Sequence, residues 1–202
     1  MKAIMISIQP KWVAKILNGE KTIEIRKTCP ARFKDLKPYE GAEPIEVYIY
    51  CTKDEELFYS RDTQKWYVAK NRKNVKRLSN GVVKAKFTLN RIDRHHVLPT
   101  EKMLPFNWNV KQKLNELCLT KEEVMAYGNG EDYQAFLWHI DKLEIFNKPK
   151  ELSEFRKLGK KCKYQGRDSF CDYCSHCDCI GDKLTKAPQS WCYVEVERWV
   201  KD

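Results

Sequence analysis

The residues from 19 to 26 have types and a spacing that suit the binding of a polar ligand. Gly19, Lys21, Glu24 and Arg26 form a G-x-K-x-x-E-x-R motif. Arginine binds a phosphate or a base edge with two parallel donors, and glutamate accepts hydrogen bonds from a base amino group. Lysine supplies positive charge or, when it is desolvated, acts as a base. The motif therefore combines donors, an acceptor and a group that can transfer a proton.

The alternating isoleucines predict how this motif is presented. In TIEIR, apolar and polar residues alternate, which is typical of a β-strand. Thr22, Glu24 and Arg26 would lie on one face of that strand and the isoleucines on the other. Two interpretations are open. The polar face lines a binding site, or it is exposed to water with an ordinary ion pair worth under about 1 kcal/mol.

A second group of candidate residues lies in a basic stretch. Residues 65–77 (KWYVAKNRKNVKR) contain six lysines and arginines and no acid. Basic side chains bind phosphates, and aromatic rings stack on unpaired bases. The stretch is expected to contact nucleic acid, or else to be a solvated loop whose aromatic residues pack on the fold. The expected contact residues are Lys65, Trp66, Lys70, Arg72 and Lys73.

Aromatic and histidine side chains elsewhere are weaker candidates. Trp191 and Tyr193 are expected on one face of a closing strand, where they either flank a bound base or belong to the core. His95 and His96 are expected in a polar loop, from which they either enter the site as acid or base or are simply exposed. His139 is expected to be a packed or hydrogen-bonded strand residue.

Five of the nine cysteines lie within 18 residues, in the pattern C-x8-C-x2-C-x2-C-x-C. Four thiolates from such a cluster would complete a tetrahedral structural zinc site. The alternatives are reduced cysteines without metal, or a disulfide formed after isolation. An odd total without a signal peptide argues against a secreted disulfide framework. The candidate zinc ligands are Cys162, Cys171, Cys174, Cys177 and Cys179.

Composition restricts the class of protein. The chain has 202 residues, of which 33% are charged and 42% hydrophobic, and these values are typical of a globular domain. No apolar run approaches the roughly 20 residues that cross a bilayer. The N-terminus lacks the apolar core of a signal peptide, so a cytoplasmic protein is expected. The net charge of +10 favours a polyanionic partner, above all nucleic acid.

The elements that must position these residues follow from periodicity and turn signals. Residues 53–80 are polar and irregular in pattern. A single domain over 1–202 is expected, with a basic insertion at about 53–80 and a Cys-rich insertion at about 159–187. The fold class is α+β, a small mixed and partly closed β-barrel flanked by short helices. The expected strands are 5–9, 22–27, 44–52, 82–92, a pair or one bent strand over 135–146, and 190–200; the expected helices are 10–18, 110–118 and 120–127, with a helical turn at 151–155.

The opening SIQPKWVAKILNGEKTIEIRK resembles that of ASCH domains, which belong to the PUA-like superfamily. The segments VYIYCT, GVVKAKFTLNRID, FLWHIDKLEIFNKPKELSEF and APQSWCYVEV are similar to later strands of bacterial and phage ASCH proteins. The resemblance covers nearly the whole chain except about 53–80 and 159–187. It implies a PUA-like barrel with a cleft beside the first helix, and RNA binding or the reading of modified bases.

The same resemblance raises an enzymatic alternative. The ASCH family includes enzymes, among them an N4-acetylcytidine amidohydrolase and a ribonuclease. The amidohydrolase uses the motif lysine, which Lys21 matches, and a threonine three residues later, where this chain has Glu24. It also uses a glutamate from a distant segment, in the region that here contains Glu101, Glu122 and Glu123.

The preferred interpretation is recognition of nucleic acid, RNA first, or of a modified nucleoside, through a cleft beside the first helix. Lys21, Glu24 and Arg26 are the expected recognition residues. One alternative is a hydrolase acting on RNA or on an acylated nucleoside, with Lys21 and Glu24 as the reactive pair. Another is a protein-interaction or inhibitor module that uses its basic surface against an acidic protein partner.

Overall fold

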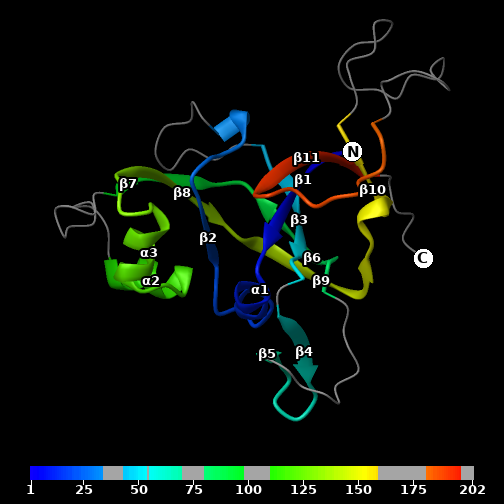
Figure 1. The fold of residues 1–202 in the computed structure, drawn as a ribbon, viewed down its shortest axis with the longest axis horizontal. Helices are drawn as coiled ribbons and strands as arrows, with labels where there is room; N and C mark the ends of the chain where they lie inside the picture. Colours follow the sequence, from blue (N-terminus) through cyan, green and yellow to red (C-terminus); the bar gives the residue numbers. More distant parts are fainter. Residues whose placement is uncertain (34–42, 54, 70–79, 98–109, 159–180, 197–202) are drawn as a thin grey trace, which may run out of the picture.

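The computed structural model describes residues 1–33, 43–53, 55–69, 80–97, 110–158 and 181–196 (Figure 1). In chain order the elements are β1 (Lys2–Ile8), α1 (Pro10–Leu17), β2 (Ile23–Arg26), η1 (Ala31–Phe33), β3 (Ile45–Cys51), β4 (Glu56–Ser60), β5 (Lys65–Ala69), β6 (Val82–Leu89), β7 (Ile92–Val97), α2 (Val110–Leu117), α3 (Lys121–Tyr127), β8 (Tyr133–His139), β9 (Asp141–Lys150), η3 (Leu152–Glu154), β10 (Phe155–Lys157) and β11 (Trp191–Val196).

The largest sheet has six strands in the order β10-β11-β1-β3-β6-β9. β1 and β3 are parallel, and the other neighbours are antiparallel. α1 leaves the end of β1 at Pro10, whose fixed φ suits the first position of a helix. After α1, Gly19 has a φ of +72°, a conformation that costs glycine little and lets the chain turn into β2.

A three-stranded sheet, ordered β2-β8-β7, shares the main core with the first sheet. β2 lies between two apolar clusters. Ile23 and Ile25 pack with Leu117 of α2 and Val124 of α3, whereas Trp138 of the paired strand β8 belongs to the main core. Figure 1 shows α2 and α3 lying against this sheet. Because both faces of β2 are covered, all four of its residues are buried.

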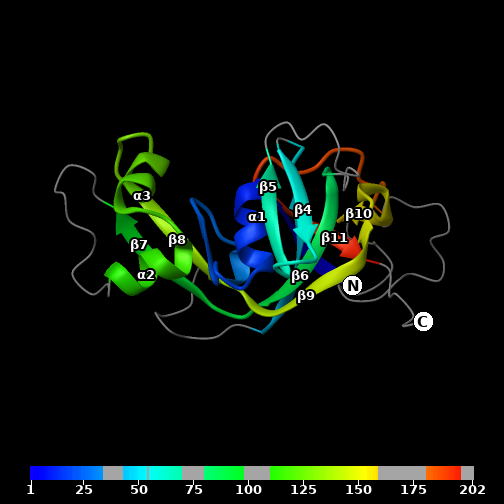
Figure 2. The same ribbon diagram turned by 90° about the horizontal axis from the view of Figure 1, so that it is seen from below.

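β4 and β5 form a separate two-stranded hairpin that projects beyond α1 (Figures 1 and 2). Asn18 attaches the hairpin to α1: its Nδ2 donates to Trp66 O at 3.0 Å, and its Oδ1 accepts from Trp66 N at 2.8 Å. Trp66 and Val68 pack on the main core. The predicted irregular structure is therefore wrong for the residues of the hairpin, because their alternating aromatic and apolar side chains pair across two strands.

The predicted α+β class, with mixed strand pairing and short helices, is confirmed, and the two larger sheets enclose the main core. The strand predicted over 82–92 is present as β6 but ends at Leu89, and Ile92 begins β7, which belongs to a different sheet. His95 and His96 are consequently strand residues of β7, and their predicted loop position is wrong. Within the described ranges, no helix is both long and apolar enough to cross a membrane.

The second of the two short helices begins as the sequence predicts. Thr120 Oγ1 accepts from Glu123 N at 3.1 Å, and Glu123 Oε2 accepts from Thr120 N at 2.9 Å. This reciprocal capping box satisfies two backbone donors that a helix start would otherwise leave unpaired. α3 packs against the sheet that contains β2 through Val124.

Candidate functional site

Lys21 lies where the turn after α1 meets the end of α2. Its Nζ donates to Leu117 O at 2.8 Å and is 3.3 Å from Glu24 Oε2. The same atom lies 5.4 Å from the centre of the Trp12 ring. Leu117 is the last residue of α2, so the ammonium group satisfies a carbonyl at the negative end of the helix dipole. The backbone of α2 thus fixes the position of Lys21.

Arg26 connects β2 with the end of β1 and the start of β11. Its Nη2 donates to Ser7 O at 2.8 Å and is 3.0 Å from Glu24 Oε1. Its Nη1 donates to Ser190 Oγ at 3.3 Å. Glu24 therefore has a cation at each of its two carboxylate oxygens. The remaining donor of the guanidinium, Nε, is buried and has no hydrogen-bond partner among the described residues.

These three side chains, here called the charged cluster (Lys21, Glu24 and Arg26), are buried. Their exposed fractions are 2%, 7% and 8%. The interpretation of an exposed strand face with an ordinary ion pair is therefore wrong for these residues. Thr22 was predicted on the same face but is exposed, because it precedes the first residue of β2. Three ionised groups held out of water require close mutual pairing, and the distances above provide it.

Aromatic rings lie beside the charged cluster. Trp138 is directly opposite Glu24 in the pairing of β2 with β8 and is completely buried. Its ring meets that of Trp191 edge-on at 5.7 Å, and Trp191 meets Tyr193 edge-on at the same distance. Trp191 and Tyr193 share one face of β11, as the sequence predicts, and Cys192 packs with a different cluster. Both aromatic residues are half-buried against the main core.

Sequence reasoning missed Trp138 and Ser190 as neighbours of the charged cluster. In the sequence, Trp138 has the position of an ordinary apolar strand residue. The register of β2 against β8 places it opposite Glu24. Ser190 precedes β11 and reaches Arg26 through the pairing of β11 with β1. Neither contact leaves a local pattern in the sequence.

A second polar group, here called the Asp93 group (Arg91, Asp93, Lys113 and His139), lies on the other face of the three-stranded sheet. Asp93 accepts from Arg91 Nε at 2.8 Å and lies 2.9 Å from His139 Nε2. Burial of Asp93 opposes its ionisation, but the hydrogen bonds from His139 and Arg91 outweigh burial and hold its pKa well below the usual range. His139 is thus hydrogen-bonded in a strand, as predicted. This group holds α2 to the sheet through Lys113, 3.8 Å from Asp93.

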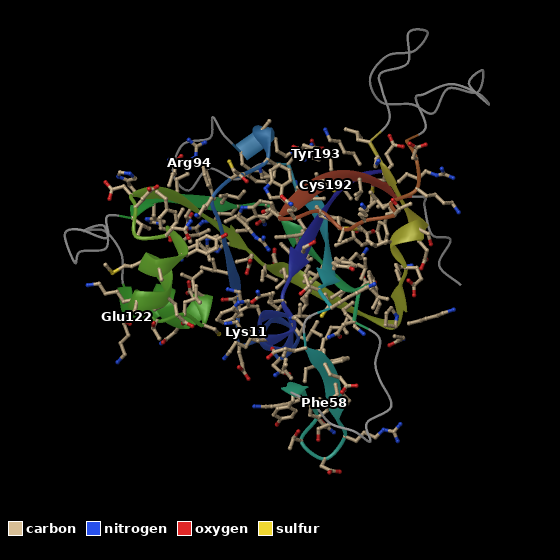
Figure 3. The ribbon with its side chains drawn as sticks, in the orientation of Figure 1. Lys11, Phe58, Arg94, Glu122, Cys192 and Tyr193 are labelled. Carbon is tan, nitrogen blue, oxygen red and sulfur yellow. The ribbon has the colours of Figure 1, made fainter. Side chains whose placement is uncertain are left out.

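The basic stretch is described only in part, and there it differs from the prediction. Lys65 is exposed, but Trp66 faces inward and packs on the main core. The outer face carries Phe58 and Tyr67, whose rings stack at 5.8 Å. Figure 3 shows Phe58 on the projecting hairpin, away from Tyr193 on β11. The outer face of the hairpin is therefore separate from the aromatic side chains of β11. The predicted contact residues Lys70, Arg72 and Lys73 lie outside the described residues.

The five clustered cysteines also lie outside the described residues, so structural zinc there stays a prediction. Within the described part of the chain, no three His, Cys, Asp or Glu side chains are placed to hold a metal ion. Outside this cysteine cluster, Cys51 is buried and Cys192 is half-buried.

No protein-family model matches the sequence, and no curated protein matches it. Solved structures similar to this chain include the crystal structure of ASCH from Zymomonas mobilis, with 17% identity and a TM-score of 0.43 over 74% of this chain and 73% of that chain. A serine-to-alanine mutant of that protein has 16% identity and a TM-score of 0.43 over 74% of both chains. Its tyrosine-to-phenylalanine mutant has 16% identity and a TM-score of 0.42 over 75% of this chain and 77% of that chain.

These structures bear the name of the family that the motif resembles. At such low identity and TM-score, nothing of their function transfers to this chain. Any function must therefore be argued from the charged cluster and the rings beside it.

Proposed function

We infer that the chain recognises nucleic acid, with RNA as the preferred candidate, or a modified nucleoside, through the charged cluster. One observation carries this proposal: Glu24 and Arg26 of β2, with Lys21 from the turn before that strand, form a buried and mutually paired group beside the rings of Trp138 and Trp191. Donors and an acceptor in a fixed array read base edges, and aromatic faces stack on bases. The net charge of +10 supports a polyanionic ligand.

The same contacts serve the fold, and an experiment must separate the two roles. Lys21 donates a hydrogen bond to the last carbonyl of α2, and Arg26 donates one from β2 to the backbone of β1. Lys21→Met keeps the length of the side chain and removes its charge. It is expected to weaken binding of a short single-stranded RNA by about tenfold, which corresponds to the loss of one or two charged contacts. Binding is measured by fluorescence anisotropy, and folding by circular dichroism and thermal unfolding.

Lys15→Met is the matched control, because Lys15 is only partly buried on α1 and its Nζ lies 3.6 Å from Glu20 Oε2. Its RNA affinity should equal that of the wild type. If a folded Lys21→Met variant binds as tightly as the wild type, the charged cluster is not the recognition site. If both lysine variants lose affinity equally, the effect is one of overall charge.

The contact between Lys21 and Glu24 favours a second candidate, a hydrolase. At 3.3 Å, the two groups are close enough for a proton to pass between them, or through them to a substrate. The test is turnover of N4-acetylcytidine and of RNA, followed by chromatography of the products. Glu24→Gln should abolish turnover if the pair is reactive, whereas binding without turnover in the wild type would exclude this candidate.

A further inference from the structure

Two buried N–H donors in the site have no acceptor among the described residues. They are Nε of Arg26 and Nε1 of Trp138, and these two residues are 8% and 0% exposed. A buried donor without a partner forfeits its hydrogen bond to water, and native structures contain few of them. The neighbouring indole differs, because Trp191 Nε1 donates to Thr28 Oγ1 at 2.9 Å. The two unpaired donors therefore need a specific explanation.

The pairing of β2 with β8 places both donors on one side of the sheet. Arg26 is opposite Phe136, and Glu24 is opposite Trp138. Arg26 and Trp138 are thus diagonal neighbours across two antiparallel strands, within reach of each other for long side chains. Their unpaired donors come from adjacent positions on the face that carries Glu24.

The charge of the cluster gives a second, independent indication. Lys21 and Arg26 contribute two positive charges, and Glu24 is the carboxylate that contacts both of them in the described part of the chain. A buried charge without compensation is costly. Spare donors and an excess of positive charge are together satisfied by one kind of ligand group, an oxyanion that accepts hydrogen bonds and carries negative charge.

We propose that Arg26 Nε and Trp138 Nε1 bind the phosphate of a nucleotide. This inference rests on the proposed recognition of nucleic acid and names the part of the ligand that the cluster holds. Both donors are directed to phosphate oxygens, Arg26 supplies charge, and Trp191 and Tyr193 lie beside the attached base. The ligand enters where the site meets solvent, at the exposed hydrogen bond between Trp191 and Thr28.

The experiment compares ligands that differ only in the phosphate. The four common ribonucleosides and their 5′-monophosphates are titrated into the full chain by isothermal titration calorimetry. Each monophosphate is expected to bind at least about tenfold more tightly than its nucleoside, as two charge-assisted hydrogen bonds predict. Equal affinities of nucleosides and monophosphates would overturn the phosphate assignment and leave the proposed recognition of nucleosides intact.

Two matched tryptophan variants identify the donor. Trp138→Phe removes the unpaired N–H and keeps an aromatic ring, and it should reduce the advantage of monophosphate over nucleoside by about fivefold to tenfold. Trp191→Phe removes an N–H that Thr28 already accepts, and it should leave that advantage unchanged. An equal reduction in both variants, or in neither, would show that Trp138 is not a phosphate ligand.

Inorganic phosphate tests the phosphate subsite separately from the proposed function. If no nucleoside, monophosphate or oligonucleotide binds, the proposed function is wrong, and inorganic phosphate still tests the subsite. Phosphate should raise the unfolding temperature of the wild type in a saturable manner, since a ligand that binds the folded state stabilises it. Trp138→Phe should abolish that saturable rise, and Trp191→Phe should retain it. A rise of equal size in all three proteins, or no rise in the wild type, would overturn the inference.

Discussion

At the scale of single residues, Glu24 combines burial with two ion pairs. Its carboxylate lies between Lys21 and Arg26 at 3.3 Å and 3.0 Å, and it is almost completely buried. Removing the negative charge would leave the cations of Lys21 and Arg26 in the interior without the carboxylate that compensates them. The same residue thus serves the stability of the fold and, under our proposal, the polarity of the site.

Glu24→Gln is expected to lower the free energy of unfolding by about 3 kcal/mol, since breaking a buried ion pair leaves an uncompensated charge. Urea denaturation followed by fluorescence measures the change. Glu20→Gln is the control: Glu20 is exposed and lies 3.6 Å from Lys15, so its replacement should change stability by less than about 1 kcal/mol. Similar losses in the two variants would contradict the role assigned to burial.

The Asp93 group makes stability dependent on pH. Because hydrogen bonds from His139 and Arg91 hold the pKa of Asp93 below its usual range despite burial, its ionised form stabilises the folded state at neutral pH. That stabilisation is complete above about pH 4, the ordinary value for an aspartate, and is lost as the pH falls further.

Asp93→Asn should therefore lower the free energy of unfolding at pH 7 by about 2 kcal/mol, the value of hydrogen bonds to a charged group. The difference between variant and wild type should shrink as the pH is lowered from 5 towards 3. Urea denaturation at several pH values measures it. A difference that stays constant across this range would mean that the charge of Asp93 is not responsible.

At the scale of elements, the hairpin of β4 and β5 packs on the main core and is also hydrogen-bonded to Asn18, the residue that follows α1. Asn18 pairs with both backbone polar groups of Trp66, in place of a neighbouring strand. Asn18→Ala should cost about 2 kcal/mol, since two hydrogen bonds are lost. Hydrogen exchange should become faster in β5 in particular. Asn115→Ala, at an exposed position of α2, is the control and should leave exchange in β5 unchanged.

The Cys-rich segment allows a further test. If it forms the predicted zinc site, freshly reduced protein should contain about one zinc ion per chain, measured by plasma mass spectrometry. Replacing Cys174 and Cys177 with serine should release the metal. Replacing Cys118, which is free and lies outside the cluster, should not. Metal-free reduced protein would exclude the zinc site.

Local patterns predicted the elements well where alternation or helical spacing was strong. β2 followed from its isoleucines, and α3 from the pairing of Thr120 with Glu123. β7 was missed because RIDRHHV is polar along most of its length, and the hairpin was missed because charged residues surround short aromatic strands. The residues of the charged cluster were named from the motif. The burial of these residues could not be predicted from the motif, because it depends on α2, β8 and β11, which cover β2 and are distant from it in sequence.

At the scale of the whole molecule, the net charge of +10 gives a prediction that no single residue carries. Binding of single-stranded RNA should weaken with salt, by about 50-fold between 50 mM and 200 mM if four phosphates are contacted, because counterions are released. Anisotropy titrations at several salt concentrations give the slope. An uncharged nucleoside, the matched control, should bind almost independently of salt. An RNA affinity that does not depend on salt would argue against phosphate contacts.

The pairing of β1 with β11 also has a consequence for how the protein is made. One edge of β1 pairs with β3, which follows within about fifty residues, but the other edge pairs with β11, where Lys2 lies opposite Glu195. Contacts of such long sequence separation form slowly. Arg26 receives its Ser190 contact only when that strand is in place. The nascent chain therefore completes its charged cluster only after Ser190 has been synthesised, and a chain that stops before β11 lacks this contact.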